Sequence, residues 1–274
     1  MATMIDTHLT GKVALVTGAN QGIGAATATA LAAEGVAVFL TYKRLPPLNE
    51  PAYPAAYDQA RAADAGDVVR RIRAAGGTAE AVEADLADPQ TPGALFDQAE
   101  QVLGPVQILV NNASGWLSDT FAAQERDGFG RPLRPVAAET YERQFGVDVR
   151  APALLISEFA RRHIERGADW GRIIGLTSGG PQGFPTEVSY GAAKAAQENY
   201  TMSAAHELGR YGITANMVHP PITDTGWINE EVAKLAGTGT PLRSVGRPED
   251  VAEVITFLAS HQGRRVTAQV VRMY

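Results

Sequence analysis

The chain has 274 residues, 45% of them hydrophobic and 20% charged, with a formal net charge of −6 and no cysteine. These values are typical of one globular domain with a sizeable core, and they exclude disulfides, thiolate catalysis and collagen-like, coiled-coil or disordered classes. The net negative charge does not favour nucleic-acid binding, and no apolar run reaches the roughly 20 residues that cross a bilayer. We therefore expect a cytoplasmic protein that binds neither nucleic acid nor a membrane.

Short β-branched runs alternate with Ala-rich helical stretches along almost the whole chain. This alternation predicts a single doubly wound Rossmann-type α/β domain over residues 1–274, with a seven-stranded parallel sheet and helices on both faces. The expected strands are residues 13–17, 36–42, 79–84, 106–110, 172–177, 213–218 and 266–271. The expected helices are residues 23–33, 57–75, 92–102, 140–165, 190–211 and 248–260.

Three long segments interrupt this alternation, and we expect them to be loops: residues 45–56, 114–138 and 223–245. The last two directly follow predicted strands. Because open α/β sheets bind ligands at the carboxyl ends of their strands, these two loops are candidates for binding.

A glycine-rich turn joins the first strand to the first helix. Its spacing is G-x-x-x-G-x-G, and helix N–H groups at such a turn can bind a pyrophosphate. The sequence therefore predicts a dinucleotide site, although a turn needed only for packing has the same composition. The candidate residues are Gly18, Asn20, Gln21, Gly22, Ile23 and Gly24.

The end of the second strand indicates which dinucleotide binds. NAD enzymes carry an acidic residue about 20 positions after the glycines, whereas NADP enzymes place arginine nearby. Here the chain reads Tyr42-Lys43-Arg44 with no carboxylate. Two cations there favour the 2′-phosphate of NADP(H) over NAD(H), the alternative being two solvated charges.

A tyrosine and a lysine, Tyr190 and Lys194, stand one helical turn apart, and Ser178 precedes Tyr190 by twelve positions at the end of the fifth strand. A carbonyl that accepts hydride needs a proton donor and a second hydrogen bond. We expect Tyr190 to be the acid/base, Lys194 to lower the phenol pKa, and Ser178 to position the substrate oxygen. A solvated surface pair is the alternative, and no histidine or metal is required.

These residues together resemble the short-chain dehydrogenase/reductase family along nearly the whole chain, in particular its 3-oxoacyl-carrier-protein reductase-like members. Besides the glycine turn, Ser178 and the Tyr-x-x-x-Lys pair, the resemblance rests on Asp85-Leu86, Asn111-Asn112-Ala113 and Asn216-x-Val218-His219-Pro220.

The resemblance implies further site residues. It implies that Tyr190 and Lys194 also contact the cofactor, with Lys194 holding the nicotinamide ribose. It further implies that the chain assembles as a homo-oligomer, a tetramer or a dimer, through the helices near residues 140–165 and 190–211. The implied neighbours of the cofactor are Asp85 and Leu86 at the adenine, Asn112, Ala113 and Ser114 along it, and Pro220, Thr223 and Thr225 at the carboxamide.

The chain departs from the family pattern at several positions. Ser114 and Pro221 replace glycines, and the usual glycines after the last strand are missing. Asp148 stands where the family has its fourth catalytic residue, asparagine. A carboxylate there is expected to offset Lys194, raise the phenol pKa and spare carbonyl reduction more than alcohol oxidation. The alternative is that Asp148 is a tolerated variant and that its backbone carbonyl does the holding that the family assigns to asparagine.

The sequence thus predicts an NADP(H)-dependent oxidoreductase that interconverts a carbonyl and a secondary alcohol. The alternatives are a cofactor-binding protein with a regulatory role and a related enzyme with non-redox, epimerase- or dehydratase-like chemistry. Aromatic and apolar side chains in the long loops predict a largely apolar small-molecule substrate, unless they only pack the loops. These are Trp116, Phe121, residues 182–185, Trp227 and Ile228.

Overall fold

The computed structural model describes residues 6–180, 182–239 and 241–274. Pro181, in the expected turn between Ser178 and Tyr190, lies outside these residues. The main sheet has seven strands, all parallel, in the order β3-β2-β1-β4-β7-β8-β9. Its strands are β1 (Val13–Thr17), β2 (Ala37–Tyr42), β3 (Thr78–Glu83), β4 (Ile108–Asn111), β7 (Gly171–Leu176), β8 (Ile213–His219) and β9 (Val270–Arg272). The predicted seven-stranded doubly wound fold is confirmed.

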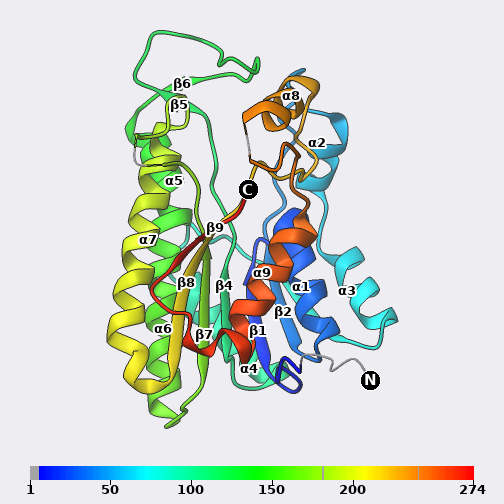
Figure 1. Cartoon of the computed structure of the whole chain (residues 1–274), viewed down its shortest axis with the longest axis vertical. Coiled ribbons are helices and arrows are strands. Elements are labelled where there is room, and N and C mark those ends of the chain that lie inside the picture. The colour runs from blue at the N-terminus through cyan, green and yellow to red at the C-terminus, as the bar shows by residue number, and fades with distance from the viewer. Residues whose placement is uncertain (1–5, 181, 240) are drawn as a thin grey trace.

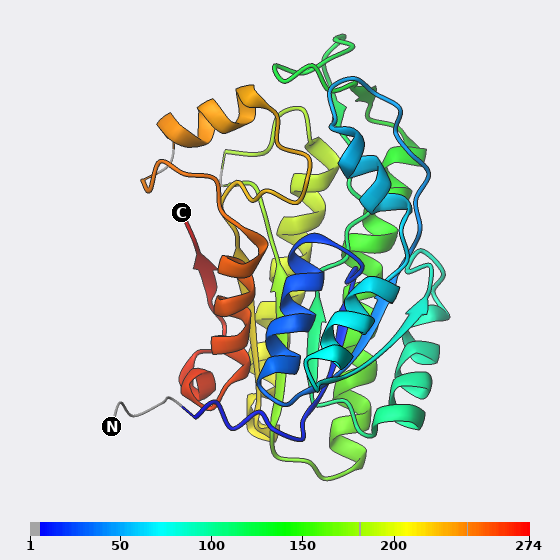
Figure 2. The same cartoon turned by 90° about the vertical axis from the view of Figure 1, so that its right-hand side faces the viewer.

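Helices cover both faces of this sheet (Figures 1 and 2). One core cluster joins the sheet to α1 (Gly22–Ala33), α3 (Gly66–Ala74) and α9 (Pro248–Ala259). The other joins it to α4 (Thr91–Leu103), α6 (Ala151–Glu165) and α7 (Val188–Leu208). Central strands such as β1 and β7 are buried along their whole length, which explains their continuous apolar sequences. Within the described ranges, none of the helices combines the length and apolarity needed to span a bilayer.

The helix expected over residues 57–75 is wrong in one respect, because it is two helices. The first, α2 (Ala55–Ala62), ends where Ala63 becomes extended, with ψ 151°. Asn20 of the glycine turn donates to the carbonyl oxygens of Ala60 and Ala63 at 3.4 and 3.0 Å. Asp64 then accepts the N–H of Gly66 at 2.8 Å and opens α3. A contact from a distant segment therefore sets the break, and an Ala-rich pattern does not reveal it.

The helix expected over residues 140–165 is also divided. It consists of α5 (Ala138–Phe145), a π-helical turn at Gly146–Arg150, and α6. Such π-helical turns are rare in proteins, and those that occur often lie at functional sites. This one carries the buried Asp148.

The long segments after β2, β4 and β8 gather beyond the carboxyl ends of the strands, at the top of Figure 1. The segment after β4 forms the short pair β5 (Asp119–Thr120) and β6 (Arg134–Pro135). The segment after β8 was expected to be a loop throughout, but it contains helix α8 (Glu230–Gly239). Acidic Glu230 and Glu231 at its start and the buried pair Val232 and Ala236 were signals for this helix.

Candidate active site

The glycine turn has a backbone that other residues do not readily adopt. Gly18 and Gly22 have φ of +65° and +54°, in the left-handed region. A Cβ on Gly24 would lie 2.3 Å from the carbonyl oxygen of Gly18, and one on Gly18 would lie 2.8 Å from the Cα of Ala113. These contacts bring the turn against the segment after β4, where Asn112 donates to the carbonyl oxygens of Thr17 and Gly18, both at 2.9 Å.

The N-terminus of α1 is open. In the described part of the chain no side chain caps it, and its N-cap residue is Gln21. Helix N–H groups without partners attract anions. Thr225 lies against this end, because a Cβ on Gly22 would be 2.9 Å from its methyl carbon. Ile23 packs instead into the adjoining core. The turn therefore has the form of a phosphate site, with Thr225 beside it.

Asn20 and the second-strand cations, which the sequence suggested for the cofactor, have partners within the protein. Asn20 uses its amide to hold α2. Lys43 pairs with Asp85 at 2.5 Å, and Arg44 pairs with Glu83 at 2.7 Å, all four side chains being substantially exposed. Hydrogen bonding to Arg44 holds the pKa of Glu83 below its ordinary value. Both positive charges are thus already matched by carboxylates that follow or end the next strand.

The remaining cofactor candidates line the same edge of the sheet. Ala113 and Ser114 follow Asn112, and Ser114 accepts the N–H of Trp116 at 3.1 Å. Leu86 is buried beside the exposed Asp85. Thr223 donates to the carbonyl oxygen of Pro221 at 2.9 Å. Pro221 and Pro220 lead from β8 into this loop, and Pro221 packs onto Gly246, where a Cβ would meet its ring at 2.6 Å.

Ser178, Tyr190, Lys194 and Asp148 come together at this edge. The hydroxyl of Ser178 lies next to that of Tyr190 and acts to lower the pKa of the phenol. The Nζ of Lys194 lies 5.6 Å from the centre of the Tyr190 ring, and 3.0 Å from the Oδ1 of Asp148. The side chains of Lys194 and Asp148 are 2% and 0% exposed, so the ion pair is shielded from water.

Asp148 is fixed by two further donors. Its Oδ2 accepts the N–H of Gly115 and the amide of Gln144, both at 2.7 Å. Lys194 also donates to Gln197 at 3.2 Å. The side chain of Asp148 thus holds the lysine and ties the loop after β4 to helix α7.

The pKa of Tyr190 moves in the direction opposite to the one expected from Lys194 alone. Burial raises the pKa of this phenol well above its ordinary value, and the negative charges of Asp148 and Glu187 raise it further. Because Asp148 matches the charge of Lys194, the lysine does not bring about the expected lowering. The phenol is therefore protonated around neutral pH.

The loop after β4 holds the start of the tyrosine helix, which the sequence did not indicate. Asp119 is fully buried and accepts the N–H of Ser189 at 2.8 Å and its hydroxyl. Arg131 lies between Asp127, at 2.6 Å, and Glu187, at 2.7 Å. Asp119 and Ser189 are 70 positions apart, so no local spacing signals the contact.

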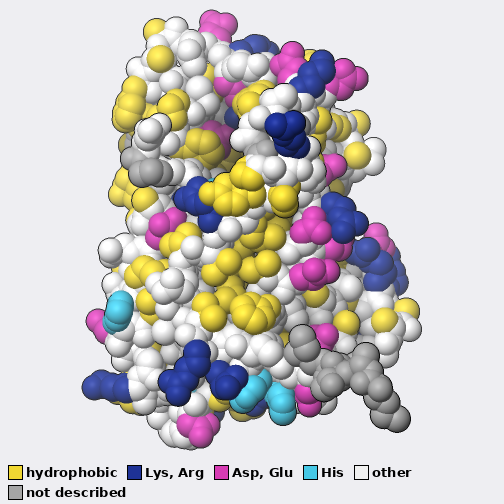
Figure 3. All heavy atoms as spheres, in the orientation of Figure 1, with side chains coloured by type: hydrophobic (Ala, Val, Ile, Leu, Met, Phe, Trp, Pro, Cys, Tyr) yellow, Lys and Arg dark blue, Asp and Glu magenta, His cyan; other side chains and the backbone are white. Residues whose placement is uncertain are grey.

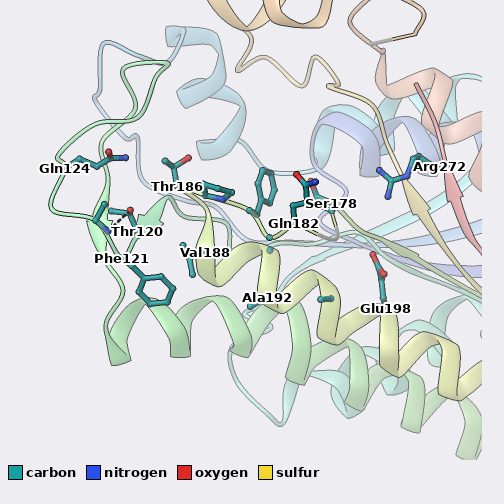
Figure 4. A pocket seen from close by; sticks show the side chains of 18 residues that line it. Thr120, Phe121, Gln124, Ser178, Gln182, Thr186, Val188, Ala192, Glu198 and Arg272 are labelled. Atoms are coloured by element: carbon teal, nitrogen blue, oxygen red, sulfur yellow. Dashed lines mark hydrogen bonds between the residues drawn. The ribbon is translucent and has the colours of Figure 1, made fainter. Parts of the chain in front are cut away.

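A cavity of about 910 Å³ opens beside Ser178 (Figure 4). Phe121, Gln182, Phe184 and Pro185 line it, as the sequence suggested for the substrate region. Trp116 and Trp227 are not among its lining residues. Their rings surround the Arg131 guanidinium at 5.4 and 5.9 Å instead, and Ile228 is half-buried next to Trp227. The residues expected to bound the substrate are therefore divided between a cavity and a packed loop cluster.

No group of histidine and acidic side chains in the described ranges is arranged to hold a metal ion. The site contains a hydroxyl pair, a buried ion pair and an open helix N-terminus. Such an arrangement can bind a phosphorylated cofactor and donate a proton to an oxygen that gains negative charge.

Comparison with known proteins agrees with this geometry. Residues 18–273 match the family model described as enoyl-(acyl carrier protein) reductase. Elsinochrome reductase 1 of Elsinoe fawcettii is 34% identical over 287 residues, covering 98% of this chain and 96% of that protein.

Two solved structures contain the bound cofactor. The blue fluorescent protein from a metagenomic library, in complex with NADPH, is 33% identical with a TM-score of 0.78 and covers 97% of each chain. A short-chain dehydrogenase from Burkholderia cenocepacia, in complex with NADP, is 30% identical with a TM-score of 0.79 and the same coverage. This chain therefore belongs to the short-chain dehydrogenase/reductase family of oxidoreductases.

Proposed function

We propose that this oxidoreductase uses NADP(H) to interconvert a carbonyl and a secondary alcohol, with Tyr190 as acid/base. The observation that carries the proposal is the grouping of the neighbouring Tyr190 and Ser178 hydroxyls with the buried Lys194–Asp148 ion pair, whose ammonium lies 5.6 Å from the centre of the Tyr190 ring. This cluster shares one edge of the sheet with the open N-terminus of α1. A proton donor and an anion site thus lie on one side of the molecule.

The residues present fit a dinucleotide. The close approach that Gly18 and Gly24 allow leaves a cradle that a Cβ would fill, and the N–H groups of α1 face it. The turn from Gly18 to Gly24 would hold the pyrophosphate. Asn112, Ala113 and Ser114 would line the cofactor, Lys194 would hold the nicotinamide ribose, and Pro220, Thr223 and Thr225 would flank the carboxamide. The bound cofactor supplies the hydride. The two NADP-bound structural neighbours support NADP(H) as that cofactor.

The chain's own residues would handle the proton. Ser178 donates a hydrogen bond that positions the substrate oxygen, and Tyr190 delivers its proton there as negative charge develops. Because burial and Asp148 raise the pKa of Tyr190, the phenol stays protonated at neutral pH. This favours carbonyl reduction over alcohol oxidation.

The cavity beside Ser178 indicates the class of substrate. Phe121, Phe184, Pro185 and Val188 give it apolar walls. Phe121 is 82% exposed, which makes its ring available to a ligand. A largely apolar ketone matches these walls.

We further propose that copies of the chain associate. Figure 3 shows hydrophobic side chains gathered over α9 and β9. Phe257 of α9 and Val270 of β9 are 47% and 38% exposed. Exposed apolar patches of this kind mark interaction surfaces, and a dimer or tetramer measured by light scattering is the expected result; a monomer would contradict this proposal.

The reaction is tested by following NADPH and NADH at the nicotinamide absorbance against ketones, diketones and β-ketoacyl thioesters. Turnover that prefers NADPH and disappears in Tyr190→Phe supports the proposal. Substrate conversion without net loss of NADPH would instead identify the epimerase- or dehydratase-like chemistry. Tight NADPH binding without any conversion would identify a regulatory binding protein.

A further inference from the structure

Helix α2 lies over the glycine turn, in a segment that follows β2. Asn20 of the turn holds the end of α2 through the carbonyl oxygens of Ala60 and Ala63. At the other side of the turn, a Cβ on Gly226 would lie 3.8 Å from the Cα of Tyr57. Helix α2 therefore spans from the glycine turn to the loop that carries Thr225, above the open end of α1.

Arg61, on the last turn of α2, is buried without an anionic partner. It is 7% exposed, and its Nε is buried with no acceptor. Its one ring contact is Tyr57, whose centre lies 5.6 Å from the guanidinium carbon. In the described ranges, no carboxylate or carbonyl oxygen accepts a hydrogen bond from its side chain. An unpaired buried cation is costly, so this arrangement calls for a further ligand.

The two other buried arginines each have an acceptor in the protein, although the Nε of Arg172 is buried without a partner, as that of Arg61 is. Arg131 pairs with Asp127 and Glu187. Arg172 donates to the carbonyl oxygen of Gly171 at 2.8 Å and stacks on Trp170 at 4.3 Å. Arg61 has neither kind of acceptor, although it lies beside a phosphate-binding turn.

A second cation, Arg143, lies on helix α5. Its carbonyl oxygen would lie 2.9 Å from a Cβ on Gly115, which places it next to the loop after β4. Its side chain has no ion pair within the part of the chain that the structure describes. Partial burial lowers the pKa of Arg143, and the positive charges of Arg134 and Arg61 lower it further. The positive charges of Arg61 and Arg143 thus repel each other, and the two residues belong to helices α2 and α5.

We propose that Arg61, together with Arg143, binds a phosphate group of the dinucleotide, so that α2 straps the cofactor against the glycine turn. This inference rests on the proposed function. The planar guanidinium of Arg61 can bind two phosphate oxygens at once, and the phosphate charge relieves the repulsion between the two arginines. The N–H groups of α1 would bind the cofactor from the opposite side. The phosphate is either the pyrophosphate or the 2′-phosphate, and the two differ in which nucleotides depend on Arg61.

The test measures dissociation constants of NADPH, NADH, 2′,5′-ADP and ADP by calorimetry, for the wild-type protein and for Arg61→Gln. The matched control is Arg71→Gln, on the neighbouring helix α3, because Arg71 is exposed and has no ion pair among the described residues. We expect Arg61→Gln to weaken NADPH binding by about 10- to 100-fold, as loss of a charged hydrogen bond does, and Arg71→Gln to change it by less than about twofold.

The pattern across nucleotides identifies the phosphate. A loss confined to NADPH and 2′,5′-ADP assigns Arg61 to the 2′-phosphate, and an equal loss for all four assigns it to the pyrophosphate. Unchanged NADPH affinity in a folded Arg61→Gln protein overturns the inference while leaving the proposed function intact. A wild-type protein that binds no NADPH overturns both. Should Arg61→Gln fail to fold, the surface variant Arg143→Gln decides, since it must weaken NADPH binding by more than the Arg71→Gln control does.

Discussion

Two helices, α1 and α7, begin at the same edge of the sheet, and their N-termini differ in whether another part of the protein binds them. The start of α7 is held from within the protein, because buried Asp119 accepts both the N–H and the hydroxyl of Ser189. The start of α1 has no such partner in the described chain. The carboxylate of Asp119 fixes the start of α7, and Tyr190 lies in this first turn. A helix end without such a carboxylate is available to an external anion. In the proposed function, the held end positions the proton donor and the open end binds the pyrophosphate.

The largest effect on NADPH binding is expected when a side chain fills the space at the open N-terminus of α1. Gly24→Ala places a methyl group 2.3 Å from the carbonyl oxygen of Gly18 and 2.5 Å from the amide of Asn112. We expect NADPH binding to weaken by more than about 100-fold and the free energy of unfolding to fall by about 1–3 kcal/mol, the usual cost of overpacking. Fluorescence titration and urea denaturation measure the two effects. Gly93→Ala is the control, because a Cβ there meets nothing within 4 Å. Normal NADPH binding by Gly24→Ala would contradict the proposed cradle.

Removing the carboxylate at the held end is expected to loosen α7. Asp119→Ala leaves the N–H of Ser189 buried without its acceptor, so the free energy of unfolding should fall by about 2–3 kcal/mol. Turnover should fall more than NADPH affinity, since the cofactor end is untouched. Ser189→Ala, which keeps the backbone hydrogen bond, should cost about 1 kcal/mol. Equal stability of Asp119→Ala and the wild type would show that Asp119 does not hold the helix.

The negative charge of Asp148 is expected to set the pH dependence of the reaction rate. The negative charge of Asp148 raises the pKa of Tyr190, so Asp148→Asn should lower that pKa. Alcohol oxidation needs the phenolate, so the rising limb of its pH profile should move to lower pH. Carbonyl reduction needs the protonated phenol. As the pH rises, its rate in Asp148→Asn should therefore begin to fall at a lower pH than in the wild type. Oxidation and reduction profiles measured from pH 6 to about 10.5 check this; an unmoved oxidation limb would contradict the electrostatic role of Asp148.

The smallest effect is expected at the end of β2. Lys43 is exposed and pairs with Asp85 at 2.5 Å, so Lys43→Gln removes a charge that is already matched. Exposed pairs contribute little, and NADPH affinity should change by less than about threefold. A tenfold loss would mean that Lys43 leaves Asp85 to bind the 2′-phosphate, and would restore the interpretation that the sequence favoured.

The sequence predicted the sheet well because its strands are buried on both faces and carry continuous apolar runs, as in β1 and β7. It also singled out Ser178, Tyr190, Lys194 and Asp148, which the fold brings together. It could not predict the break between α2 and α3, which depends on Asn20.

The contacts of the site were less accessible to sequence reasoning than its members. Lys43 and Arg44 look like free cations in the sequence because Asp85 and Glu83 stand about 40 positions later. Arg61 looks like one more surface charge on an Ala-rich helix. Its burial depends on how α2 lies over the glycine turn, which is a tertiary contact.

The most direct test of the account measures binding and chemistry separately in Tyr190→Phe. The glycine turn proposed for the pyrophosphate lies on a different element from Tyr190, and the phenylalanine keeps the ring beside Lys194, so the variant should bind NADPH with wild-type affinity. Its single-turnover rate of carbonyl reduction should fall by about 100- to 10,000-fold, the usual contribution of a general acid. Reduction at the wild-type rate with NADPH bound would show that Tyr190 is not the donor.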